Sequence, residues 1–204
     1  MTKLARLLVL SLLAVPALAL ADAKVNEPAP GFTLKDSNGK TVKLADFVGK
    51  DIVVLEWLNY ECPFVRKHYD TKNMQDLQAK YTAKGVKWFS IISSGAGQEG
   101  NFPPKEVIAR NKKEGGHQTA VLLDYDGKVG KSYGAKTTPH MFVIGKDGKI
   151  AYMGGIDDKR STDKEDVKTA KNFVAAALDE MSESKPVTVA SAPAYGCSIN
   201  YASK

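Results

Sequence analysis

The sequence predicts an α/β fold in which a mixed sheet lies between helices. Apolar runs of strand length alternate with helical stretches, and the last two runs form a hairpin. Strands joined by helical crossovers are parallel, whereas hairpin partners are antiparallel. The order β-α-β-α-β-(α)-β-β-α therefore predicts parallel strands plus an antiparallel pair, preceded by an N-terminal hairpin.

Seven strands are predicted from their apolar patterns. The N-terminal hairpin turns at an Asn-Gly pair, and the C-terminal hairpin turns at a loop that contains Gly. The first crossover strand is mostly apolar over its length, as expected for a buried strand. In chain order the strands are 32–34, 41–44, 51–58, 86–92, 120–123, 141–144 and 149–153.

Helices fill the intervals between the strands. Apolar residues at helical spacing predict one helix over 63–82. A double proline at 103–104 opens a charged helix that ends near Lys113, and 129–133 form at most one helical turn. The last helix has an apolar stripe opposite charged residues. The stripe consists of Val167, Ala170, Val174, Ala177, Leu178 and Met181.

Composition bounds the class of protein. The 204-residue chain is 43% hydrophobic and 25% charged, which fits one globular domain and excludes wholesale disorder. Its net charge of +6 comes mostly from scattered lysines, so we expect no nucleic-acid partner. Two cysteines are too few for a disulfide-stapled scaffold or a four-cysteine zinc site. Each sulfur therefore acts as an individual group.

The first residues have the layout of a secretory signal peptide. Lys3 and Arg6 precede an apolar core over 7–18, and 19–21 form a small-x-small cleavage triplet. That core is shorter than the roughly 20 residues of a membrane-spanning helix. We expect residues 1–21 to be removed, leaving a periplasmic or secreted chain that is not embedded in a membrane. Its cysteines then work in an oxidising compartment.

The chain is expected to divide into three parts. Residues 1–21 form the signal peptide and 22–183 the folded domain. Residues 184–204 are rich in Ser, Ala and Pro, and we expect them to form a flexible tail that carries Cys197.

Cys62 lies where the first buried strand gives way to a helix. The next residue, Pro63, suits the first turn of a helix. A thiol in this place faces unpaired backbone N–H groups and the positive end of the helix dipole, which both stabilise a thiolate. The alternative is a buried structural cysteine. The position favours a reactive, nucleophilic Cys62.

Four stretches carry a family resemblance. They are VVLEW at 53–57 with CPFV at 62–65, APGFTL at 29–34, LADFVGK at 44–50, and Thr138-Pro139-His140. Together they resemble the thioredoxin-like superfamily, and particularly the peroxiredoxin-like (alkyl hydroperoxide reductase/thiol-specific antioxidant, AhpC/TSA) and thiol–disulfide interchange branches. The resemblance spans about 28–178 and implies a thioredoxin-like three-layer sandwich.

The resemblance also assigns a role to the segment before the 141–144 strand. It implies that Thr138 and Pro139 form a cis-proline loop beside Cys62, where backbone is presented to a partner chain. A proline that opens a strand cannot donate to the ladder, which fits such a loop. An ordinary trans proline is the alternative.

The chain departs from both branches of the superfamily. Dithiol exchange uses Cys-x-x-Cys, so that the second thiol resolves the mixed disulfide, and here that position is Val65. Peroxiredoxins have Thr or Ser three residues before the peroxidatic cysteine and Pro seven before it, where this chain has Asn59 and Leu55. Asn59 could still donate to a peroxide oxygen. Arg110 and Arg66 are candidates for the peroxidase arginine.

Cys197 is the second sulfur, and it is either incidental or resolving. Some peroxiredoxins resolve with a C-terminal cysteine, and that analogy suggests a two-step cycle. The Cys62 thiolate attacks a peroxide and becomes a sulfenic acid, and Cys197 of the same chain or of a second copy in a homodimer condenses with it.

The resulting hypothesis is an exported, peroxiredoxin-like thiol oxidoreductase with an antioxidant role. It reduces a peroxide or exchanges with a protein thiol or disulfide, is reset by an external thiol reductant, and uses no cofactor or metal. The catalytic residues are Cys62 and Cys197, with active-site neighbours Asn59, Pro63, Thr138 and Pro139.

Two alternatives remain open at this point. The first is a periplasmic thiol–disulfide partner without peroxidase turnover. The second is a non-catalytic or copper-handling binding module, in which Cys62, His68 and His140 converge, because thiolate and imidazole ligands suit copper.

Overall fold

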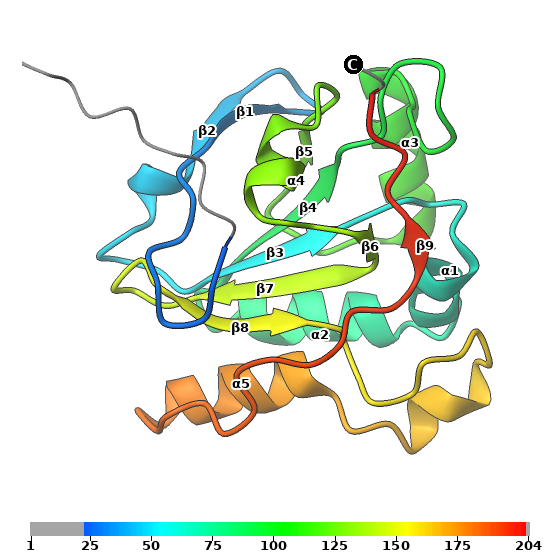
Figure 1. Ribbon diagram of the computed structural model, residues 1–204. Helices are drawn as coiled ribbons and strands as arrows, with labels where there is room; N and C mark the ends of the chain where they lie inside the picture. Colours follow the sequence, from blue (N-terminus) through cyan, green and yellow to red (C-terminus); the bar gives the residue numbers. More distant parts are fainter. Residues whose placement is uncertain (1–22, 203–204) are drawn as a thin grey trace, which may run out of the picture.

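A seven-stranded mixed sheet is the centre of the fold (Figure 1). The computed structural model describes residues 23–202, so the predicted signal peptide at 1–21 lies outside the described residues. The strand order is β2-β1-β5-β4-β3-β7-β8. The bounds are β1 Thr33–Asp36, β2 Thr41–Lys43, β3 Val53–Trp57, β4 Lys87–Ile92, β5 Ala120–Leu123, β7 His140–Ile144 and β8 Ile150–Gly154.

Strand directions follow the connections between the strands. β3, β4 and β5 are parallel, and helical crossovers join them. β1 and β2 form the N-terminal hairpin, and β7 and β8 form the C-terminal one, with β7 antiparallel to β3. The predicted fold class is therefore confirmed. Every β3 residue is buried, so the chain leaves the sheet for the Cys62 turn from its most protected strand.

Helices cover both faces of the sheet. The core cluster on one face includes residues of α1, α2, α3 and α5, and the cluster on the other includes residues of α4 and of the 3-10 turn η1 at Leu44–Asp46. The helices are α1 Pro63–Asp70, α2 Asn73–Thr82, α3 Pro104–Glu114, α4 Lys128–Ser132 and α5 Phe173–Ser182.

The single helix predicted over 63–82 is wrong, because two helices occupy this stretch. The chain breaks at Lys72, which has a left-handed φ of 64°. The Thr71 hydroxyl donates to the carbonyl of Lys67 at 2.8 Å, so this carbonyl in the last turn of α1 has a hydrogen-bond partner. A left-handed residue cannot continue a right-handed helix, and α2 therefore starts afresh at Asn73.

The last helix begins later than its apolar stripe predicts. Val167 lies in the separate 3-10 turn η2 at Glu165–Lys168, and Ala170 precedes the helix. Asn172 is the N-cap of α5, and its side-chain oxygen accepts from the backbone N–H of Ala175 at 2.8 Å. Asn172 also forms a backbone bridge with Asp157, which fixes where the helix starts.

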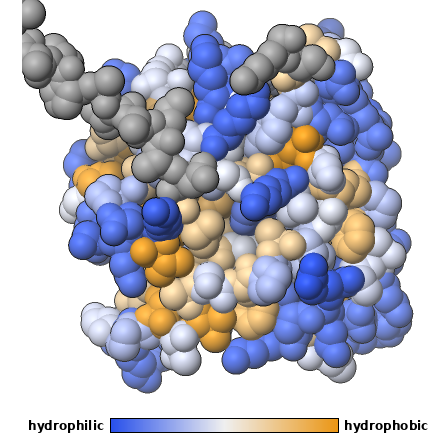
Figure 2. Space-filling view, in the orientation of Figure 1, coloured by the Kyte–Doolittle hydropathy of each residue, from blue (hydrophilic) through white to orange (hydrophobic). Residues whose placement is uncertain are grey.

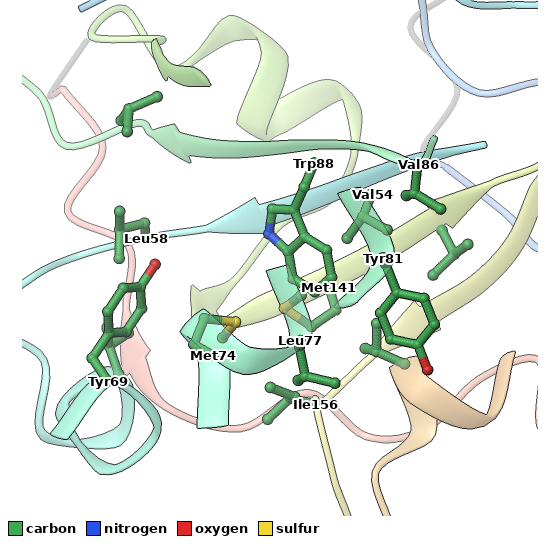
Figure 3. Packing of buried hydrophobic residues seen from close by; sticks show 14 of the residues in the cluster. Val54, Leu58, Tyr69, Met74, Leu77, Tyr81, Val86, Trp88, Met141 and Ile156 are labelled. Atoms are coloured by element: carbon green, nitrogen blue, oxygen red, sulfur yellow. The ribbon is translucent and has the colours of Figure 1, made fainter. Parts of the chain in front are cut away.

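The larger core cluster surrounds Trp88, a fully buried residue of β4. Figure 3 shows its ring among Val54, Met74, Leu77 and Met141. These side chains come from two strands and from α2. They pack the helical layer against the middle of the sheet.

A buried carboxylate ties the first two helices to the sheet. Glu56 of β3 accepts hydrogen bonds from Trp88 Nε1 at 2.9 Å, Ser90 Oγ at 2.9 Å, Gln78 Nε2 at 3.2 Å and Tyr69 OH at 2.9 Å. Burial raises the pKa of Glu56, and these hydrogen bonds act against that rise. Since Tyr69 lies on α1 and Gln78 on α2, Glu56 holds both helices against the central strand.

The C-terminal segment, expected to be flexible, is docked on the domain instead. Backbone hydrogen bonds join Met153 of β8 to Ala190 and Ala192. Farther along, β9 (Cys197–Ser198) pairs with β6 (Thr137–Thr138), and Figure 1 shows the red segment crossing the end of the sheet. Gly154 of β8 permits this close approach, because a side chain there would overlap the carbonyl of Ala192.

Most of the apolar surface is enclosed between the layers. Among residues 23–202, Val48 and Ile108 are the large hydrophobic side chains that remain exposed. Figure 2 shows hydrophilic side chains around much of the periphery of one face, with apolar ones toward its centre and lower left. Within the same residues, no helix combines the length and apolar character needed to span a bilayer.

Candidate active site

Cys62 is the N-cap of α1, in the turn that follows β3. Its backbone N–H donates to Asn59 O at 3.2 Å, and its carbonyl accepts from Arg66 N–H at 2.8 Å as the first bond of the helix. The side chain is 0% exposed. The Sγ donates to the carbonyl oxygen of Thr138 at 3.0 Å, which is a bond that a protonated thiol makes.

The residues just before and after Cys62 shape the turn. The side-chain oxygen of Asn59 accepts from the N–H of Glu61 at 3.0 Å, and its Nδ2 lies 3.5 Å from Glu99 Oε1. The Asn59 amide is therefore engaged in holding the turn. Pro63 occupies the first turn of α1, where its missing N–H costs nothing.

The cis-proline loop lies against the Cys62 sulfur. The Thr138–Pro139 peptide bond is cis, so the trans alternative is wrong. Thr138 is 4% exposed, and its carbonyl is the one that receives the Cys62 thiol. Within the described part of the chain, its hydroxyl has no hydrogen-bond partner. A polar group is thus left unsatisfied in the residue next to the sulfur, which costs free energy.

Cys197 lies on the same loop. It is the residue of β9 that pairs with Thr138, although 135 positions separate it from Cys62. Both cysteines are free thiols. The pKa of Cys197 is raised to about 12 by burial first, then by a side-chain hydrogen bond with Cys62 and by the negative charge of a Cys62 thiolate. Because the Cys62 Sγ bonds to the carbonyl of Thr138, the residue that pairs with Cys197, the two cysteines are neighbours across this loop.

Tyr195 anchors the tail two residues before Cys197, and the sequence analysis missed it. Its hydroxyl donates to Asp157 Oδ1, and its ring packs edge-on against Phe64 with centroids 5.9 Å apart. His68 Nε2 lies 3.4 Å from the hydroxyl, and Lys67 Nζ lies 5.8 Å from the ring centroid. We call Phe64, Lys67, His68 and Asp157 the Tyr195 pocket.

The charges in the Tyr195 pocket are paired although they are buried. Lys67 Nζ donates to Lys159 O at 2.7 Å and lies 3.8 Å from Asp157 Oδ2. Burial raises the pKa of Asp157, and the Tyr195 hydrogen bond is the largest opposing effect. The pocket joins α1, the loop after β8 and the tail, so only the folded chain brings it together.

The two candidate arginines form ion pairs with carboxylates. Arg66 pairs with Asp70 and with Glu114, the latter at 2.6 Å. Arg110 pairs with Glu106 at 2.8 Å and lies 3.4 Å from Glu61. Their carboxylate partners therefore lie on α1, on α3 and in the Cys62 turn.

The histidines do not converge on a metal centre with Cys62. His68 Nδ1 bonds to the Asn73 amide at 2.9 Å, and His140 Nδ1 accepts from Lys136 N–H at 3.3 Å. Burial lowers the pKa of His68 to about 3 and that of His140 to about 4, with a smaller effect from the neighbouring lysine in each case. Residues 23–202 contain no cluster of three or more His, Cys, Asp or Glu suited to hold a metal ion.

One sizeable pocket of the fold is remote from this chemistry. It has a volume of about 690 Å³ and is lined by residues near the start of β3, the end of α2 and the end of α5, but by neither cysteine. The candidate site is thus identified by its sulfurs and by the cis-proline loop, and the resting sulfur is covered.

Comparison with known proteins gives a consistent family. The Redoxin family model matches residues 24–173. The thiol-disulfide oxidoreductase ResA of Bacillus thuringiensis subsp. konkukian is 31% identical over 127 residues, which cover 62% of this chain and 67% of that protein.

Solved structures share the fold. That of an uncharacterized conserved protein from Geobacillus kaustophilus has a TM-score of 0.77 at 28% identity and covers 89% of this chain and 94% of its own. Peroxidoxin BcpB from Mycobacterium tuberculosis has a TM-score of 0.55, covering 79% and 97%, and at 19% identity it supports the fold alone. The family match includes Cys62 and Thr138, and it ends before Cys197.

Proposed function

The chain belongs to the Redoxin family of thioredoxin-like oxidoreductases, and from that premise we propose that it is a thiol–disulfide oxidoreductase with Cys62 as nucleophile and Cys197 as resolving thiol. One observation carries the proposal: Cys197 pairs with Thr138, the residue whose carbonyl accepts the Cys62 thiol. The second sulfur that Val65 does not supply therefore comes from β9.

The order of the two sulfurs follows from their surroundings. Cys62 is the N-cap of α1, at the positive end of the helix dipole, a place that favours a reactive sulfur once the bond to Thr138 is released. Cys197 has a raised pKa, partly because of Cys62, so the two thiols do not ionise together. Once Cys62 has reacted, it no longer carries a negative charge. Its contribution to the raised pKa of Cys197 then disappears, so Cys197 ionises more easily.

The exchange then proceeds in two balanced steps. The Cys62 thiolate attacks one sulfur of a partner disulfide, so that a mixed disulfide forms and the partner's other sulfur leaves as a thiolate that takes up a proton. Cys197 loses its proton to solvent and attacks Cys62 Sγ, which forms the Cys62–Cys197 disulfide and releases the second partner thiolate. Two electrons pass from the chain to the partner, and an external thiol reductant resets the pair.

A peroxide is a second candidate substrate, and the unsatisfied Thr138 hydroxyl favours it. This buried group lies in the residue beside a sulfur that is 0% exposed, a place that suits a small polar oxidant. The Cys62 thiolate would attack the peroxide, giving a sulfenic acid and an alcohol or water. Cys197 would then condense with the sulfenic acid, giving the disulfide and water.

Intact mass and peptide mapping test the roles of the two sulfurs. The reduced wild type, treated with oxidised glutathione or with hydrogen peroxide, is expected to lose two hydrogens and to yield a Cys62–Cys197 peptide. Cys197→Ser is expected to stop at a Cys62–glutathione mixed disulfide or at a sulfenic acid, and Cys62→Ser to form neither. A disulfide within one chain leaves a monomer on a non-reducing gel, whereas resolution between two chains gives a covalent dimer.

A shifted thiol is the matched control. In Cys197→Ser/Ser198→Cys the sulfur moves one place along β9, and neighbouring side chains of a strand point to opposite sides. This protein keeps two cysteines but is expected to stall at the mixed disulfide. If it resolves as fast as the wild type, or if Cys62→Ser still consumes oxidant, the assignment of the two sulfurs is wrong. The rates with glutathione and with peroxide decide which oxidant is the substrate class.

Export also belongs to the proposal. The charged start, the apolar core and the triplet at 19–21 support removal of residues 1–21 and a periplasmic or secreted mature protein. N-terminal sequencing of the protein recovered from a periplasmic extract is expected to begin at Asp22. Recovery of the full-length chain in the cytoplasm alone would contradict this.

A further inference from the structure

Residues 195–198 lie on the domain in the manner of a bound extended peptide. β6 and β9 form a two-stranded antiparallel sheet that is separate from the main one (Figure 1). Its partners are Thr137 with Ser198 and Thr138 with Cys197. Strand addition of this kind supplies affinity through main-chain hydrogen bonds and specificity through pockets for side chains.

The first specificity element is the Tyr195 pocket. Tyr195 is 5% exposed, and its hydroxyl meets a carboxylate that is itself buried. Lys67 and His68 are fully buried around it. Charged groups are expensive to bury, so a pocket that contains a buried lysine and a buried aspartate is selective for a ligand that completes their hydrogen bonds. A tyrosine hydroxyl does so here, whereas a phenylalanine would not.

The second specificity element is the space allowed at Gly196. This residue has a φ of 138°, which side chains other than glycine rarely adopt. A Cβ there would overlap the carbonyl oxygen of Thr138. That carbonyl also receives the Cys62 thiol, so it cannot move away without disturbing the reactive sulfur. The position before the cysteine therefore accepts glycine.

We propose that β6 and the Tyr195 pocket form a binding site for an extended Tyr-Gly-Cys segment of a redox partner protein, and that residues 195–197 are a resident copy of that ligand. The inference rests on the proposed function, because it names the class of partner whose disulfide is presented to Cys62. The cysteine of the partner segment takes the place of Cys197 opposite Thr138.

Competition between the two ligands follows from their connection to the domain. A tethered segment acts at a high effective concentration, of the order of millimolar for a short flexible link. The partner segment therefore binds when the resident tail is loosened. With the tail docked, the Cys62 side chain is 0% exposed, so a protein disulfide cannot reach it.

A peptide without sulfur tests the site independently of the redox chemistry. The probe is a fluorescent synthetic peptide with the sequence of residues 193–201, in which Ser replaces Cys197. Full-length Gly196→Ala cannot close its own tail on Thr138 and is expected to bind the probe about tenfold or more tightly than the wild type, measured by fluorescence anisotropy. Probes with Ala for Gly196 or Phe for Tyr195 are expected to bind this variant about tenfold or more weakly.

Gly85→Ala is the matched control. Gly85 also has a positive φ, of 90°, but its Cβ would meet open space, so this variant carries comparable backbone strain without touching the tail. It is expected to bind the probe as the wild type does. Full-length Tyr195→Ala provides a second protein with a loosened tail, and it is expected to bind the probe as Gly196→Ala does.

Three results would overturn the proposal. The first is equal binding of the probe to Gly196→Ala and Gly85→Ala. The second is a probe whose affinity does not depend on its Gly and Tyr. The third is a wild type that light scattering shows to be a dimer while Gly196→Ala is a monomer, since the tail of a second copy of the chain would then be the occupant. Because the probe has no sulfur, failure of the Cys62–Cys197 disulfide to form would be detected separately.

Discussion

Val65 and Cys197 together decide how this site differs from a dithiol motif confined to one helix. Val65 lies on α1 at the position where a Cys-x-x-Cys motif would have its second sulfur. Its side chain is buried in the core cluster that contains Trp88. Cys197 approaches from the other side, across Thr138. A resolving thiol on a helix is fixed next to its partner, whereas a thiol on a docked tail meets Cys62 only while the tail is in place. Oxidation would therefore lock the tail on the domain, and reduction would leave it held by non-covalent contacts.

Tyr195 is the residue expected to set the strength of those contacts. Tyr195→Phe keeps the ring and removes the hydroxyl that donates to Asp157. A hydrogen bond to a charged group contributes about 1.5–3 kcal/mol, so the open form of the tail should become about tenfold or more populated. Cys62 should then react faster with iodoacetamide by about the same factor, measured from the mass of the modified Cys62 peptide.

Tyr133→Phe is the control for loss of a buried tyrosine hydroxyl. Tyr133 is fully buried and donates to Pro30 O at 2.7 Å in the core cluster on the other face of the sheet. Its substitution should lower stability without raising the rate at Cys62. An equal rise in both variants would mean that Cys62 is exposed by global unfolding and that Tyr195 does not anchor the tail.

At the scale of elements, the hydrophobic pattern of the strands and the residue types of the turns predict most of the sheet. Both hairpins and all seven of its strands are where alternation, apolar runs and Gly-containing turns place them. The break between α1 and α2 was missed because a lysine in a left-handed conformation has no pattern of its own. β6 and β9 have two residues each, and a period cannot be recognised over so short a stretch.

The start of α5 is a case in which the sequence held a usable signal. Asn is a favoured N-cap, and Asn172 stands directly before the apolar part of the helix. Asn172→Ala removes the acceptor for the N–H of Ala175 and should lower the free energy of unfolding by about 1 kcal/mol, measured by urea denaturation. Lys171→Ala, at the exposed neighbouring residue, should change it by less than about 0.5 kcal/mol. Equal effects would mean that the cap contributes nothing.

At the scale of the whole molecule, the candidate site was only half predictable. Cys62, Thr138 and Pro139 are predicted by local motifs and by the family resemblance, because the helix start and the cis-proline loop each have a sequence signature. The Tyr195 pocket has none, since Lys67, Asp157 and Tyr195 come from three separate parts of the chain. The composition of the tail predicted flexibility. The tail docks because Gly154 and Gly196 allow the two backbones to approach closely, and composition does not show this.

The buried histidines make the stability of the whole fold depend on pH. His68, faced by Lys67, Asp157, Tyr195 and Asn73, has its pKa lowered to about 3 by burial. An unfolded histidine has a pKa of about 6.5, so between these values the unfolded chain binds a proton that the folded chain does not. The contribution of His68 is complete above about pH 6.5 and is lost as the pH falls toward 3, by about 1.4 kcal/mol per pH unit.

Urea denaturation at about pH 7 and about pH 5 measures this dependence. The raised pKa of Asp157 acts in the opposite direction, because its folded form keeps a proton that is released on unfolding, so the histidine effect is best obtained as a difference between proteins. His68→Gln should be less stable at pH 7 and should lose less stability on acidification than the wild type. His117→Gln, at an exposed residue, should keep the wild-type dependence. If His68→Gln and the wild type lose stability in parallel, His68 is not held neutral in the folded protein. The contacts of its imidazole with Tyr195 and Asn73 would then have to be reassigned.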